Sequence, residues 1–248
     1  MSLKILQTKY FVWGTLLAPV VPFLYLQGRY ARYKIGRLPD ASGPTIGTSG
    51  EGGEPVRMLV IGESTAAGVG ARTHEEALAG NFARNLSRKI GRAVAWTVVG
   101  RSGITIGETI GELVPTIPDE DYDYIMLALC GNEVLKLNSP GRSRRDMIRL
   151  IGILRKSNPR ATFFMTNAPA VRLSPILPNP LKAVLGALSA LHDANARDYT
   201  SRLERVYYFR QPTYVPEGFF ADGIHPSELG YRVWSERMIE YFEQEYGW

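Results

Sequence analysis

A serine, an aspartate and a histidine lie in surroundings that suit nucleophilic catalysis. Ser64 comes shortly after the apolar run RMLVI at 57–61, and Asp222 and His225 lie three residues apart, immediately before Pro226. A serine hydroxyl becomes an effective nucleophile when a base removes its proton and a third group orients that base. The residues therefore predict acyl transfer by Ser64 and His225, with Asp222 orienting the imidazole. The alternative is that Asp222 and His225 only cap the following helix.

The segment that contains Ser64 does not fit three other motifs. Gly68 is followed by valine, where a phosphate-binding loop needs Lys-Ser or Lys-Thr, and the letters GVG do not extend into a dinucleotide fingerprint. The nucleophile elbow G-x-S-x-G needs glycine at position 66, where the chain has alanine. Because a lone serine after a strand is more often a helix cap, the prediction depends on the distant Asp-His pair.

Alternating apolar runs and amphipathic segments must position these side chains. Repeated strand–helix order predicts an α/β fold, a three-layer α/β/α sandwich around a mostly parallel five-stranded sheet. The loops at 62–70, 100–103 and 130–133 each follow a predicted strand and should open onto one edge of the sheet. The predicted strands are 57–61, 93–99, 124–129, 161–165 and 206–209, and the predicted helices are 75–90, 105–113, 144–156, 180–199 and 227–246.

Two of these segments resemble blocks of a known family, the SGNH or GDSL-like esterases and lipases. GESTAAG at 62–68 is similar to its first block, with Glu63 where many members have Asp, and DGIHP at 222–226 is similar to its last. The resemblance extends from about residue 56 to the C-terminus. It implies a flavodoxin-like fold and a catalytic triad of Ser64, Asp222 and His225.

The second and third blocks of that family are less closely matched. Gly103 in SGIT resembles the glycine whose N–H serves the oxyanion hole, with Gly100 as the alternative, and Asn132 resembles the asparagine that donates to the same oxyanion. The resemblance thus implies an oxyanion hole of Ser64, Gly103 and Asn132. The third block usually reads G-x-N-D, but here it reads CGNE at 130–133, so the shape of this loop is left open. We interpret Cys130 as a small buried hydrophobe and not as a nucleophile.

The resemblance implies hydrolysis of carboxylic esters with short-chain or lipid-like acyl groups, through an acyl-enzyme and without a cofactor. The expected partner is a small-molecule ester. The apolar, proline-rich segment 168–188 either lines an acyl or alcohol pocket or is only a connection and a core helix. A carbohydrate O-deacetylase and, from another class, a non-catalytic binding protein are the alternative functions.

Three zones divide the chain, namely an apolar and basic segment at 1–37, a Gly/Ser/Pro-rich linker at 38–55 and the hydrolase domain at 56–248. Residues 10–28 contain no charged side chain and carry aromatic residues near both ends. This pattern favours membrane contact, with a helix packed on the protein's own surface as the alternative. The basic residues that follow predict a cytoplasmic catalytic domain, either free or associated with the inner membrane.

The composition argues against several other classes of function. The net charge is +5, but no nucleic-acid-binding motif accompanies it, so we expect no nucleic-acid partner. The chain has one cysteine and three histidines and lacks HExxH and CxxC, so we expect neither an internal disulfide nor a metal site. We expect His74 and His192 to be solvated residues outside the site.

Overall fold

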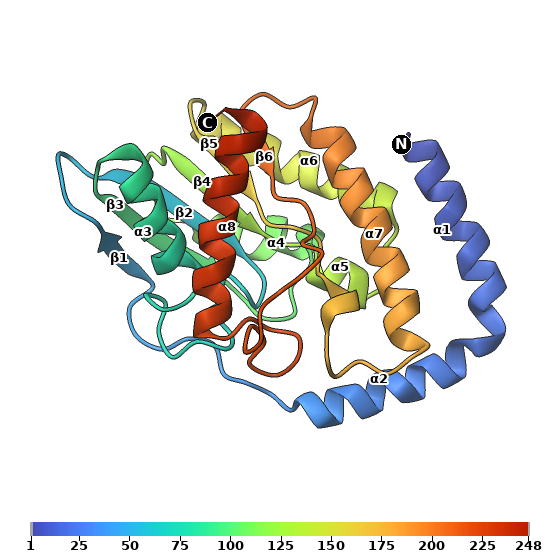
Figure 1. The fold of residues 1–248 in the computed structure, drawn as a ribbon. Coiled ribbons are helices and arrows are strands. Elements are labelled where there is room, and N and C mark those ends of the chain that lie inside the picture. Colours follow the sequence, from blue (N-terminus) through green and yellow to red (C-terminus); the bar gives the residue numbers. More distant parts are fainter. Residues whose placement is uncertain (1, 248) are drawn as a thin grey trace.

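The computed structural model describes residues 2–247, and its central feature is a six-stranded sheet with helices on both faces (Figure 1). The strand order is β1-β3-β2-β4-β5-β6, with β2 to β6 parallel. The predicted α/β/α sandwich is therefore confirmed. The strands are β1 (Ile46–Ser49), β2 (Val56–Gly62), β3 (Val94–Gly100), β4 (Tyr124–Ala128), β5 (Thr162–Met165) and β6 (Val206–Tyr208).

The sheet has one strand more than the five that we predicted. β1 comes from the segment predicted as a linker and pairs antiparallel with β3 at the edge of the sheet. A four-residue edge strand with an exposed Ile46 has no apolar alternation to reveal it. Its position depends on a tertiary contact, since a Cβ at Gly47 would lie 2.3 Å from the ring of Trp96.

Successive residues of each central strand enter different cores. Met58 and Val60 pack among residues of α3 and α8, whereas Leu59 and Ile61 pack among residues of α4, α6 and α7. All four side chains are fully buried, as expected for a parallel strand that is covered on both faces. The helices are α3 (Leu78–Ile90), α4 (Ile106–Glu112), α5 (Gly131–Leu135), α6 (Pro140–Ser157), α7 (Leu181–Thr200) and α8 (Glu228–Tyr246), with short 3₁₀ turns at Val114–Thr116 and Val171–Leu173.

Local sequence explains where several of these helices begin. Thr105 and Glu108 form a capping box at the start of α4, in which each side chain bonds to the other residue's backbone N–H. Ser139 caps α6 and Ser227 caps α8 through their hydroxyl groups. These caps fix the ends of the loops that leave the carboxyl edge of the sheet.

Two further helices precede the sheet and lie against its α7 side. α1 (Leu3–Leu17) and α2 (Val21–Ile35) are joined by a 3₁₀ turn at Ala18–Val20, and Pro19 in this turn and Pro22 at the start of α2 interrupt a straight helix. In Figure 1, α1 stands beside α7 and α2 runs along the lower edge of the molecule. By length and composition, residues 3–35 could cross a membrane, and 6% of their most apolar window is buried. This segment is therefore not a core helix of the domain.

Candidate active site

The loop that carries Ser64 leaves the centre of the sheet. Ser64 follows β2, which lies between β3 and β4, so the loops after all three strands meet at the switch point of the sheet. The carbonyl of Glu63 accepts hydrogen bonds from the N–H groups of Ala66 and Ala67 at 2.9 and 3.0 Å. These bonds hold Ser64 at the first turn of the loop, where it is half-buried.

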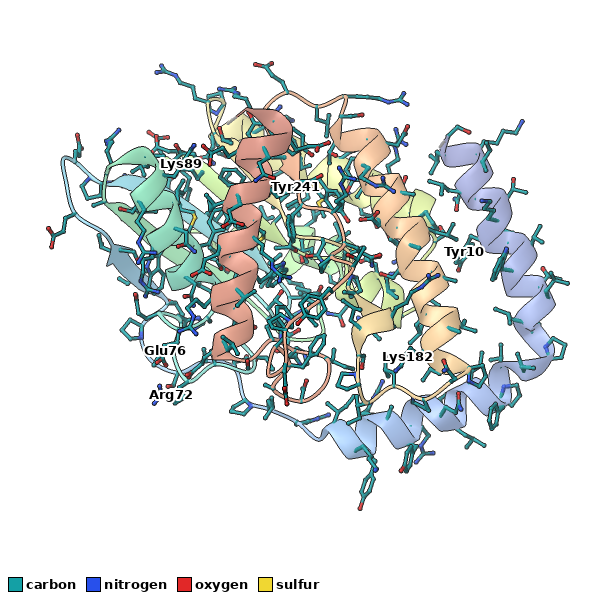
Figure 2. All side chains as sticks on the ribbon, viewed as in Figure 1. Tyr10, Arg72, Glu76, Lys89, Lys182 and Tyr241 are labelled. Carbon is teal, nitrogen blue, oxygen red and sulfur yellow. The ribbon has the colours of Figure 1, made fainter. Side chains whose placement is uncertain are left out.

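Contacts between the loop that carries Ser64 and the start of α8 bring two distant segments of the sequence together. The hydroxyl of buried Tyr231 donates to the carbonyl of Val69 at 2.7 Å, and Arg72 pairs with Glu228 at 2.8 Å. Gly70 has a φ of 97°, and a Cβ there would lie 2.1 Å from the carbonyl oxygen of Pro226. Only glycine allows this close approach between the two loops. Figure 2 shows Arg72 and Glu76 beside the lower end of α8.

The structure brings Ser64, His225 and Asp222 into one hydrogen-bonded series. Nε2 of His225 lies 3.1 Å from Oγ of Ser64, and Nδ1 lies 2.7 Å from Oδ2 of Asp222. Because a carboxylate only accepts, the proton of neutral His225 resides on Nδ1, and Nε2 faces the serine as an acceptor. This is the arrangement that a general base for Ser64 requires.

Asp222 is held in its ionised form by its own turn. Its Oδ1 accepts from the backbone N–H groups of Ile224 and His225 at 2.9 and 2.8 Å. Burial alone would raise the pKa of Asp222, but the hydrogen bonds and the charge of His225 outweigh burial and lower that pKa. The turn itself is closed by a hydrogen bond from Ala221 to the carbonyl of His225, and Gly223 has a φ of 89°.

The residues predicted for an oxyanion hole lie on the neighbouring loops. Gly103 has a φ of 83° in the turn after β3, whereas Gly100 is the last residue of that strand. Within residues 2–247, the backbone N–H groups of Ser64 and Gly103 donate to no protein acceptor. The side-chain amide of Asn132 donates one hydrogen bond to the carbonyl of Ile104 at 2.9 Å, which leaves its second N–H available.

Glu63 holds a neighbouring loop in place, a role that the sequence analysis did not predict. Its buried carboxyl group accepts from the backbone N–H groups of Gly131 and Asn132 at 2.5 and 2.7 Å, so it holds the loop that carries the asparagine. Burial raises the pKa of Glu63 to about 7, although the two backbone hydrogen bonds act in the opposite direction. Only the position of Glu63 next to Ser64 could have drawn attention to it, because its partners lie far away in the sequence.

Glu133 connects the same loop to two helices. Its carboxyl group is 1% exposed and accepts from the N–H of Ile106, the amide of Asn138 and the hydroxyl of Ser143, at 2.8, 2.8 and 3.0 Å. A charged group can remain buried when its oxygens are this fully hydrogen-bonded. The glutamate in the CGNE segment is therefore integrated into the loop's hydrogen bonding.

Cys130 holds an unusual backbone conformation at the start of this loop. Its φ is 123°, a backbone conformation that favours glycine. The side chain is partly buried, and burial raises the pKa of the thiol well above its usual range. A thiol that stays protonated is a weak nucleophile, and the partly buried side chain is less enclosed than the buried residue that we expected.

We expect Cys130→Gly to be more stable than Cys130→Ala by about 1–2 kcal/mol, because only glycine relieves the strained φ. Both variants lose the thiol, so their difference isolates the backbone. Chemical denaturation at a fixed pH measures the free energy of unfolding of each. Equal stability of the two variants would show that the loop relaxes to a different φ when the thiol is absent.

The two other histidines are buried, so the prediction that they are solvated is wrong. His192 is 2% exposed on α7, its Nε2 lies 3.0 Å from the carbonyl of Asn138, and burial lowers its pKa to about 4. The signal was available, because Leu185, Leu188 and Ala196 share its helical face. His74 is 5% exposed and lines a hollow of about 420 Å³ together with Asp40 and Val98.

The titration of Glu63 should appear in the pH dependence of stability. Its pKa is about 7 in the fold against 4.5 ordinarily, so the fold favours the protonated form. Its contribution is fully present below pH 4.5 and is lost as the pH rises through 7, with a total of about 3 kcal/mol. The contribution of His192 to the free energy of unfolding changes in the opposite direction, because its pKa is lowered in the fold. It increases between pH 4 and 6.5 and so masks the change from Glu63 in the parent protein.

We therefore expect the difference in unfolding free energy between the parent and Glu63→Gln to shrink steadily from pH 4.5 to 7. His192 is common to both proteins and is removed by the subtraction. Glu63→Asp is the matched control, since it keeps a titrating carboxyl group and should keep a pH-dependent term. Urea titrations at half-unit pH intervals measure these values, and a constant difference would contradict a raised pKa at Glu63.

The segment at 168–188 lies next to the turn that carries Asp222 and His225. The hydroxyl of Ser174 donates to the carbonyl of Gly223 at 2.6 Å, and a Cβ at Gly223 would lie 2.7 Å from Ile176. Leu177 and Leu181 pack into an apolar cluster to which Ile224 also contributes. This segment is therefore a wall beside His225. No group of three or more His, Cys, Asp or Glu side chains within residues 2–247 is placed to hold a metal ion.

A family model matches the greater part of the chain. The model is described as the GDSL-like lipase/acylhydrolase family and matches residues 60–233, a range that contains all five predicted site residues. No curated protein matches the sequence.

Solved structures with the same fold include both lipases and carbohydrate esterases. A carbohydrate esterase family 2 enzyme with a carbohydrate-binding domain from Corynascus thermopiles (Myceliophthora fergusii) has a TM-score of 0.57 at 16% identity, over 81% of this chain and 69% of that chain. A lipase from a goat rumen metagenome has a TM-score of 0.58 at 18% identity, over 75% and 96%. A family 3 carbohydrate esterase from Clostridium thermocellum has a TM-score of 0.56 at 17% identity, over 77% and 96%. The chain spans 66% of the length of a family two carbohydrate esterase from Clostridium thermocellum, and at these identities the likeness shows the fold alone.

Proposed function

This chain belongs to the GDSL-like lipase/acylhydrolase family, and from that premise we propose that it is a serine esterase for carboxylic esters with short-chain or lipid-like acyl groups. The observation that carries the proposal is the hydrogen-bonded series from Oγ of Ser64 through His225 to Asp222. A helix cap needs no contact between His225 and a serine 161 positions away. That contact is what nucleophilic catalysis requires.

Acylation begins when Nε2 of His225 takes the hydroxyl proton of Ser64 as Oγ attacks the carbonyl carbon of the ester. The resulting oxyanion accepts hydrogen bonds from the N–H groups of Ser64 and Gly103 and from the amide of Asn132. Asp222 stabilises the imidazolium that forms. When the intermediate collapses, the bond to the alcohol breaks, His225 gives its proton to the leaving oxygen, and the acyl group remains on Ser64.

Deacylation repeats these steps with water as the nucleophile. Nε2 of His225 takes a proton from water, and the hydroxide oxygen attacks the acyl carbon. Collapse of the second intermediate releases the carboxylic acid and returns the proton to Oγ of Ser64. Only the neutral imidazole can accept a proton, so His225 acts as the base in both steps and is returned to its neutral form after each.

The choice of acyl group rests on the wall beside His225. Ile176 packs against the turn that carries Asp222 and His225, and Ile224 belongs to this turn. Ile224 in turn packs against the apolar cluster that contains Leu177. An apolar wall favours an alkyl chain over a sugar, because burial of sugar hydroxyl groups there would leave them without hydrogen bonds. A specific observation favours the alternative O-deacetylase, since several proteins of the same fold are named carbohydrate esterases.

A serine-reactive fluorophosphonate and a panel of substrates test the proposal together. We expect the probe to label Ser64, identified by mass spectrometry of the labelled peptide, and to abolish hydrolysis of p-nitrophenyl acetate, butyrate and octanoate in parallel. Acetylated xylan and mannan serve as the comparison substrates. Faster release of acetate from the polysaccharides would favour the O-deacetylase, and a folded protein without label at Ser64 would favour a binding protein.

A further inference from the structure

Exposed apolar side chains are concentrated on the two N-terminal helices. Within residues 2–247, twelve of the twenty large hydrophobic side chains that are exposed lie between residues 5 and 33. They include Phe11, Leu16, Leu26 and Tyr33, which are 62%, 74%, 62% and 86% exposed. Scattered exposed apolar residues are normal, but their concentration on one short segment indicates an interaction surface.

The outward face of α2 shows how this surface is built. Leu24 and Ala31 are buried against the catalytic domain, whereas Phe23, Leu26 and Tyr30 lie exposed at helical spacing on other faces. Figure 2 shows many side chains of α2 projecting away from the domain. The helix therefore uses a narrow face for packing and presents a broad apolar one outward.

The charge of the protein is concentrated on the same segment. The first 39 residues contain six basic residues and no acidic residue, which leaves 23 of the 29 basic residues against all 24 acidic ones in the rest of the chain. The net charge of +5 is therefore carried entirely by this segment. Basic side chains beside aromatic and aliphatic ones match a bilayer surface with anionic headgroups. The six basic residues are Lys4, Lys9, Arg29, Arg32, Lys34 and Arg37.

Hydrogen bonds from the middle of each helix hold it against the domain. The hydroxyl of Tyr10 donates to the carbonyl of Leu137 at 2.7 Å, and Figure 2 shows Tyr10 on the side of α1 that faces α7. The amide of Gln27 donates to the carbonyl of Asn179 at 2.7 Å and accepts from the N–H of Leu181 at 3.0 Å. A span across the bilayer would break these bonds, and each 15-residue helix is only about 22 Å long.

The two N-terminal helices lie beside the turn that carries Asp222 and His225. Leu24 of α2 shares an apolar cluster with Leu177, Leu181 and Ile224, and Ile224 directly precedes His225. In Figure 1, α2 runs along the same lower edge as the loop that leads into α8. A bilayer against the outer face of α2 would therefore lie close to the loops that carry the site.

From these observations we propose that α1 and α2 form a platform, residues 3–35, that docks on an anionic lipid bilayer with α2 in the plane of the membrane, and that holds the site next to esters dissolved in that bilayer. Docking requires only the platform, while the choice of substrate also rests on the proposed esterase function. Apolar side chains enter the boundary between headgroups and acyl chains, and the basic side chains contact lipid phosphates. The bound protein remains peripheral, with its catalytic domain in water.

Binding of the full chain to vesicles tests the platform without any chemistry. We expect cosedimentation with phosphatidylcholine vesicles that contain 30% phosphatidylglycerol, weaker binding to pure phosphatidylcholine, and release by salt. Phe23→Glu with Leu26→Glu should lower the partition coefficient at least about tenfold. The matched control, Ile46→Glu with Ile148→Glu, makes the same charge change at exposed apolar residues outside the platform and should lower it less than about threefold.

Four outcomes of the vesicle experiments would overturn the platform. These are absence of binding by the folded parent, an equal loss in the control pair, resistance of the bound protein to alkaline carbonate, which indicates a span, and a membrane-bound form that lacks residues 1–37. A stable dimer that the Phe23→Glu, Leu26→Glu variant dissociates would assign this face to a second copy of the chain and also overturn it.

The two proposals can fail separately. Ser64→Ala should bind vesicles like the parent, because Ser64 is not part of the platform. If the parent binds but hydrolyses no ester, the esterase proposal fails and the platform stands. If it is an esterase, the Phe23→Glu, Leu26→Glu variant should hydrolyse a vesicle-embedded ester at least about fivefold more slowly and p-nitrophenyl acetate at the parental rate. An equal change on both substrates would overturn the link between docking and substrate.

Discussion

Ser64→Ala is expected to lower kcat for p-nitrophenyl esters by at least about 10⁴-fold, while the fold and its thermal stability are retained. Among the described residues, Oγ of Ser64 is hydrogen-bonded only to His225. Its removal therefore leaves no other buried polar group without a partner. Alanine fills the same backbone position, and the oxyanion donors around it are unchanged. Ser201→Ala, at an exposed serine on the far end of α7, is the matched control and should keep the parental rate.

The double variant makes this prediction sharper. If Ser64 and His225 act as one unit, Ser64→Ala with His225→Ala should be no slower than Ser64→Ala alone, because each single change already removes the activated nucleophile. Rates that fall multiplicatively would mean that His225 acts on a different step. A parental rate in Ser64→Ala would assign the nucleophile to another residue.

The fold could be predicted from the sequence because its signals are local. Leu78, Phe82 and Leu86 recur at four-residue spacing, and all three are buried on α3. The parallel strands are short apolar runs that end in glycine or polar residues. β1 could not be predicted in this way, since it is a strand only through its pairing with β3 and the contact of Gly47 with Trp96.

The residues of the site also divide into those with a local sequence signal and those that depend on tertiary contacts. Ser64, Asp222 and His225 stand in short segments whose residue types suggest a chemistry, and the loops after parallel strands must meet at one edge of the sheet. The bonds from Glu63 to Gly131 and Asn132 join positions far apart in the chain, and nothing local announces them. The strained φ of Cys130 could not be predicted either, because a sequence gives the residue but not the conformation that its neighbours impose.

Asp222→Asn should separate a catalytic aspartate from a capping one and is expected to lower kcat by about 10³–10⁴-fold. The oxygen of asparagine can still accept from the N–H groups of Ile224 and His225, so the turn is preserved. The amide nitrogen then faces Nδ1 of His225 as a donor.

That contact moves the proton of His225 from Nδ1 to Nε2, which leaves a donor pointing at Ser64 where an acceptor is needed. Nitrogen-15 NMR of the imidazole in the parent and the variant reports the tautomer directly. If Asp222 only capped the turn, asparagine would serve equally well and the rate would fall less than about tenfold. A large loss together with a switched tautomer would instead assign Asp222 to the orientation of the base. The reason is that this change keeps the capping hydrogen bonds and alters only which nitrogen of His225 carries the proton.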